Sequence, residues 1–315
     1  MSARSGCVHH LEGPRYVLRP GDALFPAALR SIPRPPKALY VLGDPAALQE
    51  GLAVVGARKA TPYGLGLAQR FARLAAARGV AIISGGAYGC DAAAHEAALA
   101  AGAPTVAFLG GGCDMPYPAR HVGLFERIAA AGGAVVSEHP WEAPPLPQQF
   151  RTRNRLIAGL ARATLIVEAG LPSGTFSTAD EALAANRDVL VVPGAITSPY
   201  SRGANRLLYQ GATPVVDDES FSDVLFSLFG CLKQESFTQG ASEGTQSSRA
   251  RQRQLEDPLA AALSAQPLGM EELYDLASRH CGRQNPRSWL MGRLAEGEKE
   301  GLFARYPDGR WGPCA

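Results

Sequence analysis

The 315-residue sequence lacks several features that would place it in a specialised class of protein. It has no run of about 18 uninterrupted apolar residues, which argues against a membrane span. No apolar segment follows the arginines and histidines near its start, as a secretory signal peptide would require. Its six cysteines lie far apart and include no Cys-x-x-Cys pair, a poor spacing for zinc that also gives no disulfide framework. We therefore expect a soluble cytoplasmic protein with no metal site.

The sequence also has almost no excess of positive over negative charge. The 31 basic and 29 acidic residues leave a formal net charge of +2, and only 19% of residues are charged. Because 46% of residues are hydrophobic, the composition is that of a folded globular protein. If a nucleic acid binds, the positive charge that attracts it must be local, since the field of the whole molecule is weak.

One pattern recurs between residues 52 and 229: a short β-branched run, a glycine-rich turn and an alanine-rich helix. The runs are almost wholly apolar and do not alternate, which is typical of parallel strands buried on both faces. Strands are predicted at Leu52–Val55, Val80–Ile83, Thr105–Leu109, Ala134–Val136, Thr164–Val167, Asp188–Val192 and Pro214–Val216. Helices between them include Gly66–Arg78, Asp91–Ala101 and Thr175–Ala185, with Asp91 suited to an N-cap and Gly102 to a C′ position. The predicted fold class is α/β, a Rossmann-like, doubly wound, mostly parallel sheet that binds ligands at the carboxyl ends of its strands.

Composition divides the chain into four parts. Residues 1–38 are loop-rich and are expected to form an N-terminal lead-in packed on the sheet, while residues 39–230 form the Rossmann-like domain. Residues 231–256 are rich in Gln, Ser, Gly and Arg and are predicted to be a linker. Residues 257–315 could form three short helices, at Leu259–Leu263, Met270–Ala277 and Ser288–Leu294, followed by a hairpin, which predicts a small winged-helix-like domain. Its near-neutral charge is as compatible with protein contact as with DNA reading.

Glycine-rich turns follow four of the predicted strands. They are Gly56-Ala57-Arg58-Lys59, Ser84-Gly85-Gly86-Ala87-Tyr88-Gly89, Gly110-Gly111-Gly112 and Ser173-Gly174-Thr175. Glycine lets the backbone approach a ligand closely, and a helix N-terminus offers N–H groups to an anion. A parallel sheet needs tight turns in any case, but several at one edge favour a phosphate-binding crevice. The P-loop pattern and the Gly-x-Gly-x-x-Gly order are both missing, so we predict no ATP hydrolysis, no nicotinamide and no other cofactor.

The segment Phe150–Arg155 holds three arginines and one aromatic residue within six positions. Guanidinium groups match phosphate oxygens, and an aromatic face can stack on an unpaired base for about 1–3 kcal/mol. The alternative is a solvated basic helix start in which Phe150 belongs to the core. The segment by itself does not decide between the two.

The motifs resemble, in order and spacing, those of the DprA/Smf family over about residues 39–216. They are Val55-Gly56-Ala57-Arg58 with Tyr63-Gly64, Ser84-Gly85-Gly86-Ala87 with Asp91 and Ala94-His95, Gly110-Gly111-Gly112 with Tyr117-Pro118, Ser137-Glu138, Phe150 with Arg153-Asn154-Arg155, Glu168-Ala169, Ser173-Gly174-Thr175, Pro193-Gly194 and Gly203-Ala204-Asn205. The series is far more specific than any one of its members.

This resemblance implies a non-enzymatic protein that binds and protects single-stranded DNA and forms a homodimer. It also implies that the protein loads a RecA-type recombinase during natural transformation. The residues it assigns to single-stranded DNA binding are Arg58, Gly85, Gly86, Phe150, Arg153, Asn154, Arg155, Ser173, Gly174 and Thr175. We expect Arg58 to contact phosphate and Phe150 to stack on a base, while the Ser84 and Ser173 turns offer backbone amides.

The sequence departs from the family pattern at two places. Tyr88 stands where the family usually has Arg, and Pro147-Gln148-Gln149 supplies no charge where members often carry Lys before Phe150. Arg151 could compensate for the missing Lys. Each lost phosphate contact would flatten the salt dependence of binding.

Other classes of function fit these residues less well. Nucleotide phosphoribohydrolases on a related Rossmann-like fold carry a Gly-Thr-x-x-Glu motif, whereas Thr178 occupies the glutamate's place here, and a neutral hydroxyl cannot act as the base. Asp91, His95 and Glu96 could suggest a metal site, but capping and core roles are favoured. Glu138 and Glu168 are expected to orient arginines and turn amides. Besides a DNA-binding protein and a hydrolase, a third possible class is a pure interaction protein in which the C-terminal domain is the active part.

Overall fold

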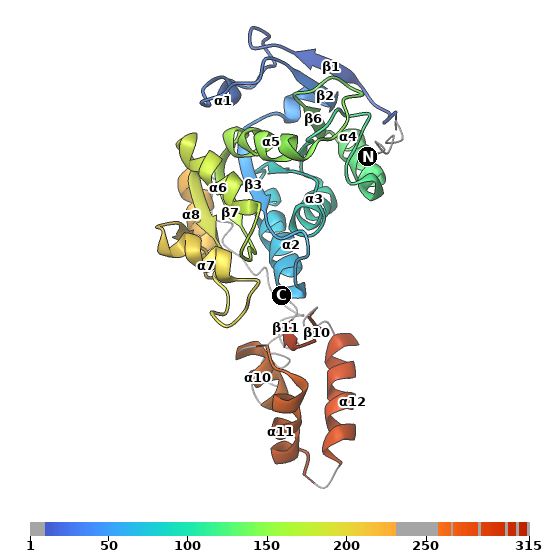
Figure 1. The fold of residues 1–315 in the computed structure, drawn as a ribbon, viewed down its shortest axis with the longest axis vertical. Helices are drawn as coiled ribbons and strands as arrows, with labels where there is room; N and C mark the ends of the chain where they lie inside the picture. Colours follow the sequence, from blue (N-terminus) through green and yellow to red (C-terminus); the bar gives the residue numbers. More distant parts are fainter. Residues whose placement is uncertain are drawn as a thin grey trace, which may run out of the picture. The chain divides into compact units, whose positions relative to one another are not determined.

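A nine-stranded sheet organises the larger part of the chain in the computed structural model (Figure 1). The structure describes residues 10–230, 258–265, 267–282, 285–299, 302–306 and 309–313. The strands lie in the order β1-β2-β6-β5-β4-β3-β7-β8-β9. Their bounds are β1 Arg15–Leu18, β2 Leu39–Gly43, β3 Gly51–Val55, β4 Ile82–Ser84, β5 Thr105–Phe108, β6 Ala134–Ser137, β7 Ala161–Ile166, β8 Asp188–Val191 and β9 Thr213–Pro214.

Pairing within the sheet is parallel from β6 through β9, and only β1 and β2 run antiparallel to their neighbours. β3 lies at the centre of the parallel part. Strands β4, β5 and β6 follow in sequence order on one side of it, and β7, β8 and β9 follow on the other side. The predicted fold class is therefore confirmed. In such a sheet the point where the direction of building reverses, between β4, β3 and β7, is where a ligand crevice forms.

Helices cover both faces of the sheet. Those of this part of the chain are α1 Ala27–Arg30, α2 Pro62–Ala76, α3 Cys90–Ala100, α4 Val122–Ala130, α5 Pro147–Leu160, α6 Thr175–Ala184, α7 Arg202–Tyr209 and α8 Asp218–Phe229, with 3-10 turns at Pro45–Ala47 and Ala119–His121. Apolar residues of α1, α5, α6 and α7 pack in one core with Val106 and Phe108 of β5. Ala107, between them, joins the opposite core with α4. Successive residues of the strand thus point to opposite faces of the sheet. Because both faces are buried, these three successive residues are all apolar.

Most predicted elements agree with the structure within one or two residues, the usual uncertainty of such boundaries. The expected strand Val80–Ile83 begins two residues later, and β9 is shorter than Pro214–Val216. The larger differences are that β7 begins three residues before Thr164 and α2 begins four residues before Gly66. The prediction that Asp91 caps α3 is wrong, because the N-cap is Gly89 and Asp91 lies inside the first turn. Gly102 does adopt the left-handed conformation, with φ of 66°, directly after the helix.

The N-terminal segment adds a strand to the sheet as well as packing beside it. β1 pairs along its whole length with β2. The Arg15 guanidinium forms a bidentate bond with the buried Asp114 carboxylate, at 2.9 and 2.8 Å, and lies 4.7 Å from the centre of the Trp141 ring. These contacts fix the edge strand to the loops that follow β5 and β6.

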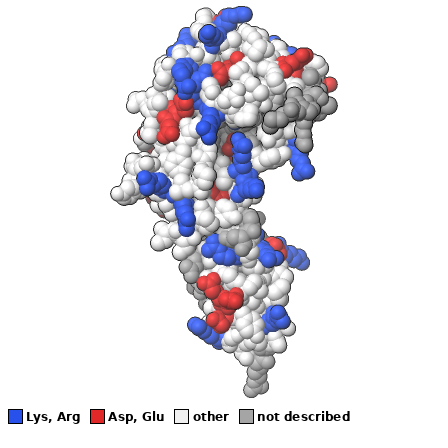
Figure 2. All heavy atoms as spheres, viewed as in Figure 1, with Lys and Arg blue, Asp and Glu red and all other residues white. Residues whose placement is uncertain are grey.

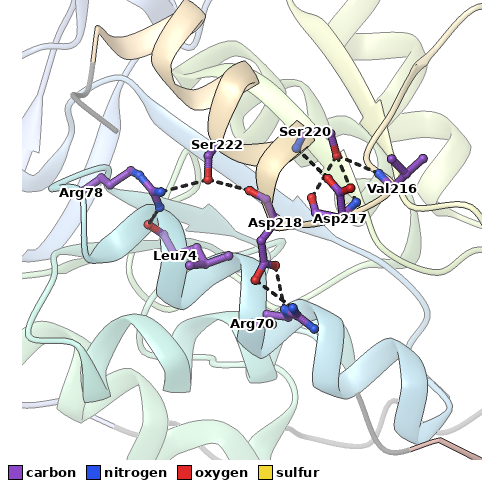
Figure 3. Close-up of polar contacts among 8 residues, drawn as sticks. All are labelled: Arg70, Leu74, Arg78, Val216, Asp217, Asp218, Ser220 and Ser222. Carbon is purple, nitrogen blue, oxygen red and sulfur yellow. Dashed lines mark hydrogen bonds and ion pairs between the residues drawn. The ribbon is translucent and has the colours of Figure 1, made fainter. Parts of the chain in front are cut away.

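Helix α8 is attached to α2 by a group of polar contacts (Figure 3). Arg70 of α2 binds both carboxylate oxygens of Asp218, at 2.7 and 2.8 Å. Arg78 donates to Ser222 at 2.9 Å. Beneath them the fully buried Phe221 packs on Phe71, with ring centres 4.7 Å apart. Apolar burial supplies most of the attachment, because exposed ion pairs contribute little.

The chain divides into two compact units, one of residues 1–60 and 67–233 and the other of residues 61–66 and 234–315. The second contains α10 Pro258–Ala265, α11 Met270–His280, α12 Pro286–Lys299 and the antiparallel strands β10 Phe303–Arg305 and β11 Trp311–Pro313. A small core including Leu263, Leu290 and Trp311 holds them together. Three helices followed by a hairpin match the expected elements, and the winged-helix assignment stays a prediction. The predicted linker, residues 231–256, lies outside the described residues.

A search of the described residues for a helix long and apolar enough to cross a bilayer found none.

Candidate nucleic-acid interface

A cleft of about 790 Å³ opens at the carboxyl ends of the central strands. The turn after β3, the first half of α5 and the turn before α6 form much of its lining. Seven of the ten predicted DNA-binding residues line it: Arg58, Phe150, Arg153, Asn154, Ser173, Gly174 and Thr175. The sheet therefore brings together segments more than 100 positions apart at the expected edge.

Basic residues are dispersed on the face of the molecule that Figure 2 draws. On the face shown in Figure 2, Lys and Arg form small separate groups among uncharged residues, with acidic residues between several of them. Three cationic side chains nevertheless line this one cleft besides Arg153, namely Arg58, Lys59 and Arg151. The cleft thus has the local positive charge that the near-neutral composition requires.

Phe150 is half-buried and sits between a cation and a second ring. The Arg58 guanidinium lies 5.8 Å from the centre of the Phe150 ring, and Tyr117 meets that ring edge-on at 5.4 Å. Arg58 is exposed, so its guanidinium can leave the ring for a phosphate at small cost. The alternative that Phe150 is an ordinary core residue does not fit a ring that lines the cleft.

Arg153 forms the charged floor of the cleft. Its side chain is 5% exposed, and its Nη1 donates to the Phe108 carbonyl at 3.0 Å. Its buried Nε has no hydrogen-bond partner among the described residues. The pKa of Arg153 is lowered to about 10, mainly by burial, with the nearby Asp91 opposing the shift and Arg58 adding to it. The group therefore stays charged at neutral pH, and because Arg153 lines the cleft its charge attracts an anion there.

Asp91 holds the glycine turn after β4 from within. Its Oδ2 accepts from the amides of Gly85 at 3.1 Å and Ala87 at 3.3 Å. Burial raises the pKa of Asp91, while the Arg153 charge and these amides oppose the rise. Ser84 is also occupied, because its hydroxyl donates to the Val54 carbonyl at 2.6 Å. The expectation that this turn offers amides to phosphate is therefore wrong for Gly85 and Ala87, whose N–H groups serve Asp91.

The turn before α6 is held by hydrogen bonds between its own residues, and its glycine faces open space. The Ser173 hydroxyl accepts from the Thr175 amide at 3.2 Å and donates to the Thr175 hydroxyl at 2.9 Å. Gly174 is exposed, and nothing lies within 4 Å of where its Cβ would be. Asn154, on α5, donates from its side-chain amide to the Ser177 hydroxyl in the first turn of α6 at 3.3 Å. This end of the cleft is polar and open to a ligand.

Two predicted glycines support the site from behind the cleft. Gly85 lines a smaller recess beside it, and a Cβ there would overlap the Arg153 guanidinium. Gly86 is buried, has φ of 65° and leaves room for the Phe125 ring. Both allow close packing, and the structure places Gly86 out of reach of a ligand in the cleft.

Arg155 does not reach the cleft, in contrast to its assignment from the sequence. It is 6% exposed and binds both Glu138 oxygens, at 2.8 and 2.6 Å. Its Nε donates to the Arg34 carbonyl at 2.8 Å, and its Nη1 also donates to Thr152. Glu138 thus orients an arginine as predicted, and the guanidinium serves the fold.

Sequence reasoning omitted several residues that line the cleft, among them Lys59, Tyr117 and Tyr200. Lys59 directly follows Arg58, so the turn motif itself could have included it. The uncharged Gln149 has a local explanation, because its side chain accepts from the Leu146 amide at 2.7 Å and caps α5.

A metal site finds no support in the described residues, where no three metal-ligating side chains come together. His95 is fully buried and shares a 2.7 Å hydrogen bond with the Thr105 hydroxyl. Burial lowers the pKa of His95 to about 3. Thr178, at the place of the hydrolase glutamate, is 3% exposed at the side of the cleft.

Comparison with known proteins gives a consistent result. The family model of DNA recombination-mediator protein A matches residues 16–226. The chain is 42% identical to protein Smf of Escherichia coli over 217 residues, 68% of this chain and 58% of that protein. It is 50% identical to a DprA protein of Mycobacterium tuberculosis over 181 residues, 56% of this chain and 46% of that protein. The chain thus spans about half the length of these relatives.

Two solved structures share the fold. DprA of Streptococcus pneumoniae superposes with a TM-score of 0.62 at 32% identity, covering 66% of this chain and 74% of that one. DNA processing protein A of Helicobacter pylori superposes with a TM-score of 0.61 at 30% identity, covering 68% and 97%. The latter structure is described as revealing a single-stranded DNA binding mode.

Proposed function

The chain belongs to the DNA recombination-mediator protein A family, also called DprA/Smf, and we propose that it binds single-stranded DNA in the cleft at the centre of its sheet. In this proposal it protects the strand and delivers it to a RecA-type recombinase during transformation or recombination. It acts as a homodimer and without catalytic turnover.

One observation carries the proposal: a charged, buried arginine shares a cleft with an aromatic ring and with a helix start whose glycine is exposed. Arg153 supplies the charge, Phe150 the ring and Ser173-Gly174-Thr175 the helix start. The charge and the helix start bind phosphate, and the ring stacks on an unpaired base. A paired base cannot present its face to a ring, so this combination favours single strands.

The residues that line the cleft have separate roles in this proposal. Arg58 and Arg153 neutralise phosphates, and the helix start of α6 receives another phosphate at Gly174. Asn154 contacts the backbone, and Phe150 stacks on a base. Gly85 makes room for Arg153 and has no direct contact with the strand, while Arg155 is left out because Glu138 occupies it.

The test is a fluorescence-polarisation titration with labelled single- and double-stranded oligonucleotides of one sequence over a salt series. We expect single strands to bind more tightly. Arg58→Ala should weaken binding and reduce the salt slope by about 0.7, the share of one phosphate contact on a single strand. Equal affinity for duplex, or an unchanged slope in Arg58→Ala, would contradict the proposal.

The recombinase and dimer proposals rest on family membership and need their own measurements. Mass photometry of the purified chain should report a dimer. A RecA filament assay on oligonucleotides coated with a single-strand binding protein should show faster filament growth when the chain is added. A monomer, or no acceleration, would remove the corresponding part of the proposal.

The hydrolase alternative is tested separately by incubating the chain with nucleoside monophosphates. We expect no release of free base, because Thr178 offers no carboxylate at the place where that chemistry needs one.

A further inference from the structure

Three aromatic side chains converge on a small recess beside the cleft. Tyr88 comes from the turn after β4, Tyr117 from the segment between β5 and α4, and Phe150 from α5. Arg58 and Gly85 complete much of the lining. Tyr88 and Tyr117 have no part in the function proposed above.

Both tyrosines are held in place yet remain open to solvent. Tyr117 is 49% exposed and packs edge-on against Phe150, at a ring-centre distance of 5.4 Å and an angle of 64°. Tyr88 is 41% exposed and packs edge-on against His121 at 4.8 Å and 75°. His121 in turn contacts the Gly86 carbonyl at 2.9 Å, so it too has a fixed position. The rings are therefore positioned before any ligand arrives, which reduces the entropy lost on binding.

The recess is too small to enclose a base, since its volume is about 30 Å³. A base would instead lie across its mouth, against the exposed parts of the rings. Arg58 already covers part of the Phe150 ring, so further aromatic surface is needed if a second base is to stack at the same rim. Bases stack on any aromatic face without regard to sequence.

We propose that Tyr88 and Tyr117, beside Phe150, form a stacking surface for a second unpaired base, next to the nucleotide whose phosphate occupies the cleft. This inference rests on the proposed function, because it assumes a strand in the cleft. It assigns the chain a base-contacting surface that adds affinity without adding a phosphate contact. Stacking and phosphate contacts respond differently to salt, and the two contributions can therefore be separated.

The experiment compares two oligonucleotides of equal length and charge, an oligothymidylate and a strand of abasic sites on the same backbone. Tyr88→Ala and Tyr117→Ala should each weaken binding to oligothymidylate by about five- to hundredfold, the range for one stacked base. Both should leave the salt slope unchanged and should not weaken binding to the abasic strand. Tyr88→Phe and Tyr117→Phe should retain affinity, because the ring remains.

Tyr16→Ala is the matched control, since Tyr16 is also 41% exposed but lies on β1 at the edge of the sheet. It should bind both strands as the unaltered chain does. Equal losses on the thymidylate and abasic strands would overturn the inference. So would undiminished binding in both alanine variants while Arg58→Ala still weakens it, and in that case the proposed function would stand. Failure of the unaltered chain to bind single strands at all would remove both.

Discussion

Replacing Gly85 by alanine tests whether the position of the Arg153 guanidinium determines the affinity of the cleft. Gly85 does not have a left-handed backbone, so alanine is conformationally allowed there. Its new methyl group would overlap the Arg153 guanidinium, including the Nη1 atom that donates to Phe108. The guanidinium must therefore move, although residue 153 itself is unchanged.

The size of the effect follows from the contacts that are lost. Forcing an extra methyl group into a packed site typically costs about 1–3 kcal/mol of folding free energy. A hydrogen bond from a charged donor contributes about 1.5–3 kcal/mol, so a displaced guanidinium should weaken single-strand binding roughly ten- to hundredfold.

Urea unfolding and fluorescence polarisation measure the two effects separately. Gly123→Ala is the control glycine, because nothing lies within 4 Å of its Cβ position, and it should leave affinity unchanged. In the Arg153→Ala background the methyl group at residue 85 has nothing to displace, so the double variant should bind no worse than Arg153→Ala alone.

A folded Gly85→Ala protein that binds single strands as tightly as the unaltered chain would show that the position of the Arg153 guanidinium does not determine affinity. Full addition of the losses from Gly85→Ala and Arg153→Ala would also contradict the prediction, because the glycine would then act independently of the arginine.

Three further predictions concern stability. Arg155→Ala should lower the free energy of unfolding by about 3–5 kcal/mol, because Glu138 is left poorly solvated and unpaired. The folded variant should keep its affinity for single strands, and weaker binding would show that Arg155 contributes to the DNA site. His95 has a folded-state pKa of about 3, so the unfolded chain takes up its proton first as the pH falls below about 6.5. In urea titrations the free energy of unfolding should fall by about 2 kcal/mol between pH 7 and 5 because of this group, and His95→Asn should not show this loss. Parallel pH profiles for the two proteins would contradict the prediction. Phe221→Ala should cost about 3–5 kcal/mol in thermal or urea unfolding, because a fully buried ring is removed; a cost below 1 kcal/mol would mean that α8 is not held by this core.

The general position of the site could be predicted because it depends on features that are local in the sequence. Apolar runs predict buried parallel strands, and turns after those strands must meet at one edge of the sheet. Arg58 and Ser173 lie in such turns, and Phe150 begins a conspicuous basic segment. Their meeting in one cleft follows from topology alone.

Which side chains face the ligand was decided only by tertiary packing. Arg153 and Arg155 are two positions apart on α5, so they point to different sides of the helix, and the sequence gives no sign of which side faces the cleft. Glu138, contributed by another segment, takes Arg155, while Phe108 and the space left by Gly85 receive Arg153. Asp91 likewise fits a cap by spacing, yet burial turns it toward the amides of its own turn. Local patterns determine strands and turns because backbone geometry is local, whereas the partner of a long charged side chain depends on residues that only folding brings near.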